Sequence, residues 1–290
     1  MLGAVFALSL VGAFTLAPQH KVARHQEAGD SSSDEAGKDH TRLRLISWNI
    51  GNGDLESETR AHAQDLAAVA QVIKDNDADA VAIQELTGEE QLSLLLAHLE
   101  NRYRGYVCNP AGADRVDAVL IKRSGDRDGR KAHDDGNVIF KDIPAGDGFA
   151  AAAIFRLHHD FPEIVLISVH ADAFRAARRR TFIADVVDWA RTQAGGDVVF
   201  IAGDFNLEVS TRNKSNLFTD DAKHDSESYA LLLKYFSDLG RDAGETSIND
   251  RRIDYIFGPL RAVSLRQAEV LQGAAVGRMD HLPLLVEVDL

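Results

Sequence analysis

Apolar residues recur along this chain with two spacings, one typical of strands and the other of helices. Short apolar runs predict strands at 43–48, 79–83, 116–122, 149–157, 163–169, 198–202, 252–257, 262–271 and 284–289. Apolar residues that return every three to four positions predict helices around 66–73, around 92–99, and over 174–193 and 227–238. Several neighbouring strands have no helix between them, which argues against a purely parallel sheet. Two mixed sheets with helices outside them fit the pattern better.

The N-terminal part differs in composition from the rest of the chain. Residues 2–17 are apolar and uncharged, shorter than the roughly 20 residues of a bilayer span and of the right length for a secretory signal. We interpret residues 1–18 as a signal peptide or, alternatively, as an uncleaved N-terminal anchor that would associate with a membrane. Both place the protein outside the cytoplasm, whether periplasmic, secreted or anchored. Residues 19–41 are expected to form a flexible linker, and 42–290 a single domain.

Charge and cysteine content narrow the classes of function. The formal net charge is −13, so a broad basic surface for phosphate backbones is absent, which argues against a passive nucleic-acid binder. An enzyme whose bound divalent cation supplies local positive charge remains compatible with this composition. Cys108 is the only cysteine, which excludes an intrachain disulfide and favours a core position over a catalytic thiol. We expect the protein to be a monomer.

Polar side chains stand at the ends of the expected strands, where apolar residues would be normal. They occur in ISWNIGN, VAIQEL, LISVHADA, FIAGDFNLEV, RRIDYIF and RMDHLPLLVEV, and are Asn49, Glu85, His170, Asp204, Asn206, Asp254, Asp280 and His281. Taken singly, Asn49 is explained as a turn residue, His170 as a hydrogen-bonded core histidine and Asp172 as a helix N-cap. Asp254 is harder to dismiss, because a carboxylate within an apolar strand needs a partner. The recurrence of such residues predicts one polar cleft where the strands converge.

The residue types in this set support a narrow range of chemistry. Carboxylates and amides without cysteine favour a hard cation such as Mg²⁺ or Mn²⁺. Two histidines with nearby carboxylates supply a base and an acid or electrostatic partner near neutral pH. Together they indicate metal-assisted attack of water on a phosphate ester. The H-E-x-x-H pattern of zinc hydrolases and the G-x-S-x-G pattern of serine hydrolases do not occur in the sequence.

The ordered set WNI, QE, VHAD, GDFN, RIDYIF and DHLP resembles the endonuclease/exonuclease/phosphatase family, over about residues 43–290. That family includes deoxyribonuclease I, abasic-site endonucleases, bacterial sphingomyelinases and inositol polyphosphate 5-phosphatases. GDFN and DHLP are the most specific of these motifs. The resemblance implies a four-layer α/β/β/α sandwich with its active site at one edge of the two packed sheets.

The resemblance also implies a metal site. Glu85 matches the metal-binding glutamate of the family, Asn49 the asparagine beside it and Asp280 an additional acid of the metal site. The implied cofactor is Mg²⁺ or Mn²⁺. One departure concerns Gly51, which stands where repair nucleases carry a further metal-site aspartate.

Five further residues match catalytic positions of the family. Asp204 and Asn206 match the pair that orients the attacking water and contacts the scissile phosphate. His281 matches the general base and Asp254 the carboxylate that orients it. His170 matches a histidine that deoxyribonuclease I-like and sphingomyelinase-like members use to stabilise the transition state. Abasic-site enzymes usually lack that histidine, which makes the repair branch a poorer match.

The segment DAVLIKR departs from the GNAILSR of many members, with Asp117, Ala118 and Lys122 at the changed positions. Deoxyribonuclease I-like members have an acid near this strand that pairs with the second histidine. In this chain either Asp114 or Asp117 could pair with His170, and neither aligns cleanly.

The resemblance leaves the substrate open. We expect a phosphodiesterase acting on nucleic acid, and an alternative is a sphingomyelinase-like or inositol phosphate hydrolase. A sphingomyelinase would need an apolar hairpin for membrane contact, and residues 124–148 are polar instead. A catalytically silent binding module on the same fold is a third possibility, against which the complete set of site residues argues.

Overall fold

The computed structural model describes most of the chain beyond the N-terminal segment. The described residues are 42–51, 63–108, 115–123, 138–157, 161–192, 198–209, 222–247 and 250–290. All of them belong to one compact unit, Lys38–Leu290. The expected signal peptide or anchor (1–18) and linker (19–41) lie outside the described residues. No helix in the described part is both long enough and apolar enough to cross a membrane.

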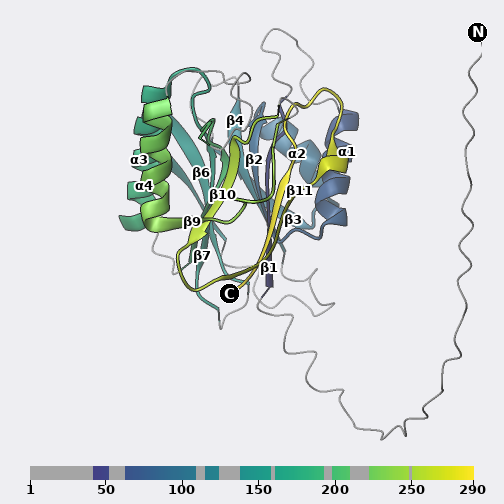
Figure 1. Ribbon diagram of the computed structural model, residues 1–290. Coiled ribbons are helices and arrows are strands. Elements are labelled where there is room, and N and C mark those ends of the chain that lie inside the picture. The colour runs from purple at the N-terminus through teal and green to yellow at the C-terminus, as the bar shows by residue number, and fades with distance from the viewer. Residues whose placement is uncertain are drawn as a thin grey trace, which may run out of the picture. The chain divides into compact units, whose positions relative to one another are not determined.

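Two mixed β-sheets form the centre of this unit (Figure 1). The first contains, in spatial order, β11 Ser264–Val270, β12 Leu284–Asp289, β1 Arg42–Asn49, β2 Ala80–Leu86, β4 Val116–Lys122 and β3 Tyr103–Val107. The second contains β5 Ile139–Ala145, β6 Gly148–Phe155, β7 Ile164–His170, β8 Val198–Asp204, β10 Asp254–Pro259 and β9 Phe236–Asp238. Strand β1 runs parallel to β2, and β7 runs parallel to β8, while the other described pairs are antiparallel.

Helices cover the outer face of each sheet (Figure 1). Helices α1 Ala63–Asp75 and α2 Glu89–His98 pack on the first sheet, and α3 Ala176–Thr192 and α4 Ala222–Tyr235 on the second. A short 3₁₀ helix, η4 Gln272–Ala274, lies between β11 and β12. One apolar core fills the space beneath each helix pair, and a third lies between the sheets. The expected α/β/β/α sandwich of two mixed sheets is therefore confirmed.

The alternation of side chains along β1 explains how a polar residue reaches the space between the sheets. Leu43 and Leu45 pack into the core between the sheets, whereas Ile46 and Trp48 pack beneath the helices. Successive side chains of a strand point to opposite faces. Asn49, in step with Leu43 and Leu45, therefore lies on the face between the sheets.

The same alternation holds in four other strands. In each of these strands, one polar residue lies two or four positions from a residue of the inter-sheet core, and therefore on the same face of the strand. These polar residues are Asp117 in β4, His170 in β7, Asp204 in β8 and Asp254 in β10. Apolar side chains fill the rest of this layer. The strands therefore direct their polar residues toward one end of the inter-sheet layer.

Three strands depart from the sequence-based expectation, and all three lie at sheet edges: β3, β5 and β9. Strand β5 exposes most of its side chains to solvent, so it lacks the apolar run on which the prediction relied. The helix expected over 227–238 begins earlier, at Ala222, and ends at Tyr235. Residues 236–238 instead pair with β10 as strand β9, so that part of the helix prediction was wrong.

Candidate active site

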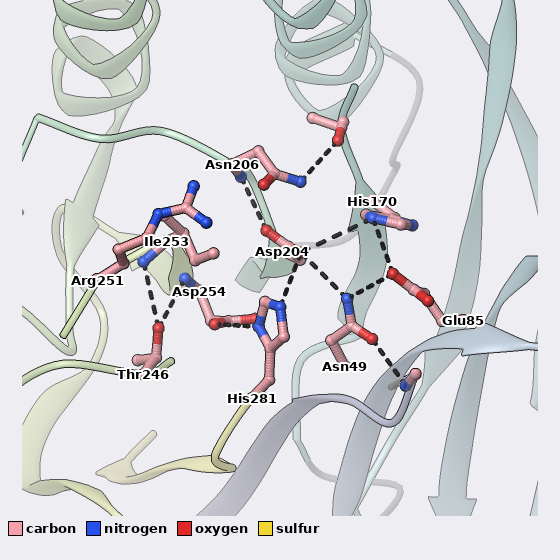
Figure 2. A network of polar contacts seen from close by, with 12 residues as sticks. Asn49, Glu85, His170, Asp204, Asn206, Thr246, Arg251, Ile253, Asp254 and His281 are labelled. Carbon is pink, nitrogen blue, oxygen red and sulfur yellow. Dashed lines mark hydrogen bonds and ion pairs between the residues drawn. The ribbon is translucent and has the colours of Figure 1, made fainter. Parts of the chain in front are cut away.

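Asp204, the last residue of β8, is the centre of a buried polar cluster (Figure 2). Its Oδ2 atom lies 3.1 Å from Nδ2 of Asn49, 3.6 Å from Nε2 of His281 and 3.7 Å from Nε2 of His170. Its Oδ1 atom accepts a 2.9 Å hydrogen bond from the main-chain amide of Asn206. One carboxylate therefore faces both histidines and both amide side-chain residues that the sequence singled out.

The second carboxylate of the cluster, Asp254, is paired with His281. Oδ2 of Asp254 lies 2.8 Å from Nδ1 of His281, and both side chains are buried. Burial alone lowers the pKa of His281, but the charges of Asp254 and Asp204 outweigh it and raise that pKa to about 10. Without a further positive charge in the site, His281 is therefore an imidazolium at neutral pH, with Asp254 holding Nδ1.

His170, on the other side of Asp204, is also accompanied by a carboxylate. Asp117 of β4, in the facing sheet, is 4% exposed and near enough to His170 for their charges to interact. Burial raises the pKa of Asp117 to about 7; the charge of His170 opposes this shift and that of Asp204 adds to it. Asp117, one of the two acids considered from the sequence, is thus placed near His170. Asp114 lies outside the described residues.

Glu85 reaches the cluster through an irregularity in β2. The register between β2 and β4 shifts between Ile83 and Leu86, so β2 carries an extra residue there. Glu85 also has a left-handed backbone with φ of 65°, and Asn206 has φ of 49°. Such conformations are rare for residues other than glycine and cluster at functional sites, where surrounding contacts maintain them.

Asn49 connects Glu85 with Asp204. Its Nδ2 group donates to Oε1 of Glu85 and to Oδ2 of Asp204, both at 3.1 Å. Its Oδ1 atom accepts a 2.9 Å hydrogen bond from the amide of Gly51, which fixes the orientation of the side-chain amide. Asn49 therefore presents N–H groups, not an oxygen, to the two carboxylates. We infer that it positions these acids and that the cation ligands come from the carboxylates.

Sequence reasoning did not identify Arg115, whose Nη1 contacts Oε2 of Glu85. Arg115 precedes β4 directly, two residues before Asp117. A side chain at Gly51 would overlap the Glu85 carboxylate at the same Oε2 atom. Glycine at position 51, where repair nucleases carry an aspartate, therefore makes room for Glu85 in this chain. The only sequence signal for Arg115 was a charged residue directly before an apolar strand.

The donor set suits a hard cation. Possible ligand atoms of Asp204, Asp254 and His281 lie within 4.8 Å of one another. His281 and Asp254 are already bonded to each other, so this trio does not offer three free donors. The oxygens of Glu85 and Asp204, which share the amide of Asn49, are the better candidates. Arg115 already offsets the charge of Glu85, but Asp204 is 2% exposed, and burial of its carboxylate is costly unless a positive charge accompanies it.

Two further predicted positions lie apart from these contacts. Asp280 is half-buried, and its negative charge contributes to the raised pKa of His281. Cys108 is 2% exposed, and burial raises the pKa of its thiol to about 12. The expectation that Cys108 is a core residue is confirmed, because a neutral buried thiol is a poor nucleophile.

Two packed mixed sheets with helices on both outer faces, and acids and histidines gathered at one end, define an α/β/β/α sandwich with a hydrolase-type polar centre. The chain belongs to the Endonuclease/Exonuclease/phosphatase family, whose sequence model matches residues 46–276. Members of this family are hydrolases of phosphate esters and are typically dependent on divalent metals. Among proteins of curated function, no sequence matches the chain significantly.

Solved structures share the fold at low sequence identity. An endonuclease/exonuclease/phosphatase from Bacteroides vulgatus is 18% identical with a TM-score of 0.63, covering 86% of this chain and 99% of its own. The human Nocturnin catalytic domain is 15% identical with a TM-score of 0.62, covering 86% and 94%. The mannosyl-6-phosphatase of Bacteroides thetaiotaomicron is 17% identical with a TM-score of 0.65, covering 86% and 100%. At these identities the likeness establishes the fold.

Proposed function

We propose that this protein is a divalent-metal-dependent phosphodiesterase that cleaves phosphate esters by attack of water, with nucleic acid as the first substrate class to test. The observation that carries the proposal is the placement of Asp204 between two histidines, one of which is held by the buried carboxylate of Asp254. Such a site holds two proton-transfer groups on either side of one acid. Hydrolysis of a phosphate ester needs this pair, because water must lose a proton and the leaving oxygen must gain one.

Each residue of the candidate active site has a role in this proposal. His281 accepts the proton of the attacking water through Nε2, while Asp254 holds the opposite ring nitrogen and stabilises the resulting imidazolium. Asp204 and Asn206 orient the water and the phosphate, since Asp204 fixes the amide of Asn206. His170, on the far side of Asp204, donates a hydrogen bond to a phosphate or leaving oxygen.

Glu85 is the principal residue that would hold the cation, with Asp204 beside it and Asn49 positioning both. When bound, the cation would supply positive charge to stabilise the phosphate and to oppose the carboxylates that raise the pKa of His281. A lower pKa would allow Nε2 of His281 to accept the proton of water near neutral pH.

A second candidate is a phosphomonoesterase acting on a phosphorylated sugar or inositol. The observation that favours it is Arg115, whose guanidinium stands beside Glu85 at the edge of the site. A terminal phosphate carries one more negative charge than a diester, and a guanidinium is suited to bind its oxygens. The substrate panel that separates the candidates contains plasmid DNA, RNA, sphingomyelin, inositol polyphosphates, mannose 6-phosphate and bis-p-nitrophenyl phosphate.

Removal of the cation is expected to abolish hydrolysis of every substrate in this panel. EDTA should eliminate activity, and Mg²⁺ or Mn²⁺ should restore it, because without a cation the negative carboxylates of the site repel the phosphate. Glu85→Gln should need a roughly tenfold higher metal concentration for half-maximal activity, on the scale of a lost charged ligand. Full activity of a metal-free preparation would rule out this mechanism. An unchanged metal titration of Glu85→Gln would remove Glu85 from the site.

We further propose that the protein acts outside the cytoplasm, on the basis of the apolar residues 2–17 and the polar linker that follows. Fractionation of the native host should recover the protein in the periplasm, the medium or the membrane fraction. Sequencing of its N-terminus then separates a cleaved signal from an anchor. Recovery of the full-length chain in the soluble cytoplasm would contradict both.

A further inference from the structure

Four buried charged side chains form a line behind the candidate active site, and none of them has a role in the chemistry described above. Arg179, Asp225, Glu208 and Arg251 are 0%, 2%, 5% and 3% exposed. They come from α3, α4, the segment after β8 and the segment before β10. We call this set the buried charge line.

The line begins at the segment that follows His170. Nη1 of Arg179 donates a 2.6 Å hydrogen bond to the carbonyl oxygen of Asp172, two residues beyond His170. Oδ1 of Asp172 accepts hydrogen bonds from the main-chain amides of Phe174 and Arg175 and so closes the turn before α3. Helix α3 begins at Ala176, so the interpretation of Asp172 as its N-cap was wrong. Arg179 thereby holds the turn that follows His170 at the end of β7.

Arg179 is joined to the segment that follows Asp204 through Asp225. Nε and Nη2 of Arg179 donate to Oδ1 of Asp225 at 3.0 and 2.6 Å. Oδ2 of Asp225 accepts the main-chain amide of Glu208 at 3.3 Å. Glu208 lies four residues beyond Asp204, so the carboxylate of Asp225 fixes the far end of the segment that contains Asn206.

The line ends at the segment that leads into β10. Oε1 of Glu208 accepts a 2.8 Å hydrogen bond from Nε of Arg251. The carbonyl oxygen of Arg251 accepts hydrogen bonds from the main-chain amides of Thr246 and Ser247. Oγ1 of Thr246 accepts a 3.0 Å hydrogen bond from the main-chain amide of Asp254 (Figure 2). Ser247 in turn forms a β-bridge with His281.

We propose that the buried charge line positions the two histidines and Asp204 relative to one another, so that Arg179, Asp225, Glu208 and Arg251 are positioning residues for the reaction. This inference rests on the proposed function. Buried ion pairs are seldom better for stability than apolar residues of the same volume, because desolvation opposes their attraction. Directional bonds from one guanidinium to two segments supply what apolar packing does not, a fixed separation between the elements that carry the reacting groups.

The line connects only one half of the site. His170, Asp204 and Asp254 belong to the second sheet, and His281 joins them through Ser247. Asn49 and Glu85 belong to the first sheet and make none of the contacts that form the line. Asp204 takes part in both groups, but Glu85, the principal candidate ligand, lies outside the line, so disruption of the line should impair catalysis more than cation binding.

The test is the double variant Arg179→Met/Asp225→Leu, which removes both buried charges together. We expect kcat on bis-p-nitrophenyl phosphate to fall about 10- to 100-fold, the scale of a small misplacement of reacting groups. KM should stay within about twofold, and the dissociation constant for Mn²⁺, measured by calorimetry, should rise several-fold less than kcat falls, since Glu85 lies on the other sheet while Asp204 belongs to both groups. The control is Lys122→Met/Asp77→Asn, which removes a buried lysine and its partner at the opposite end of β4. It should keep kcat within about twofold at temperatures where it is folded.

A readout without substrate separates this inference from the proposed function. Ring ¹⁵N resonances of His170 and His281 should move in the double variant and stay in place in the control. If the wild type hydrolyses nothing, the proposed function fails and the resonances alone decide the inference. Unmoved resonances, a kcat within about twofold of wild type, or an equal loss of Mn²⁺ affinity would each overturn it. If the double variant does not fold, Glu208→Gln is measured in the same way and judged by the same outcomes.

Discussion

Replacement of His281 by alanine is expected to lower kcat about 10²–10⁴-fold, the usual scale for loss of a general base. KM should change far less, because the lost interaction matters mainly in the transition state. Asp254→Asn should give a defect of the same kind, since Asp254 lies 2.8 Å from Nδ1 of His281. The double variant should be much less impaired than the product of the two single defects, because the two residues act as a unit. Steady-state kinetics of the three variants measure these effects.

Stability must be measured on the same preparations. His281→Ala leaves Asp254 buried without its partner, which costs about 3 kcal/mol in the free energy of unfolding. A histidine with a purely structural role would show this loss of stability and a nearly normal kcat per folded molecule. Melting temperature and kcat together separate the two cases. A well-folded His281→Ala protein with near-normal turnover would falsify the assignment of the base.

Asp117→Asn is expected to stabilise the metal-free protein in a manner that depends on pH. The folded state binds the proton of Asp117 more tightly than the unfolded chain does, with a pKa of about 7 against an ordinary value of 3.8. Ionisation of Asp117 therefore lowers the free energy of unfolding. This loss of stability is absent when the pH is below the ordinary pKa of 3.8, grows as the pH rises between the two pKa values, and is complete above about pH 7. The variant carries no such charge. The free energy of unfolding of Asp117→Asn minus that of wild type should therefore increase by about 2–3 kcal/mol between pH 5 and pH 8.

Urea unfolding in EDTA at the two pH values measures this difference. Asp75→Asn is the matched control, because Asp75 is an exposed carboxylate on α1. The stability difference between Asp75→Asn and wild type should change several-fold less between the two pH values than the difference for Asp117→Asn. An advantage of Asp117→Asn that stays constant or shrinks toward pH 8 would show that the carboxylate is not held in its protonated form, and the account of the His170 side of the site would need revision.

The sequence predicted the interior strands well because burial on both faces leaves an unbroken apolar run. Strands β4 and β12 have the expected limits, and β1, β2, β7 and β8 differ by one to three residues at their ends. The edge strands β3, β5 and β9 were missed for the opposite reason. An edge strand is half solvated, and its hydrogen bonds to one neighbour do not require a regular apolar pattern.

The candidate site was predictable where it depends on the alternation of side chains along buried strands. Asn49, His170, Asp204 and Asp254 stand out in sequence because each is polar in step with an inter-sheet apolar residue. Contacts formed through tertiary structure left no such signal. Arg115 meets Glu85 only because a bulge turns Glu85 toward it.

Two further features of the site escaped sequence analysis for the same reason. The orientation of the Asn49 amide depends on the main chain of Gly51, which no pattern of residue types specifies. The buried charge line joins residues that lie up to 72 positions apart in the chain, from Arg179 to Arg251, and each member taken alone resembles a solvated charge.

The most direct test of the central claim is hydrolysis of bis-p-nitrophenyl phosphate in ¹⁸O-labelled water, followed by mass spectrometry of the phosphate product. If the protein is a metal-dependent phosphodiesterase with His281 as its base, wild type should incorporate ¹⁸O from solvent into p-nitrophenyl phosphate. The reaction should require Mg²⁺ or Mn²⁺ and should be about 10²–10⁴-fold slower in His281→Ala. Absence of metal-dependent turnover, or a product without label from water, would contradict the account.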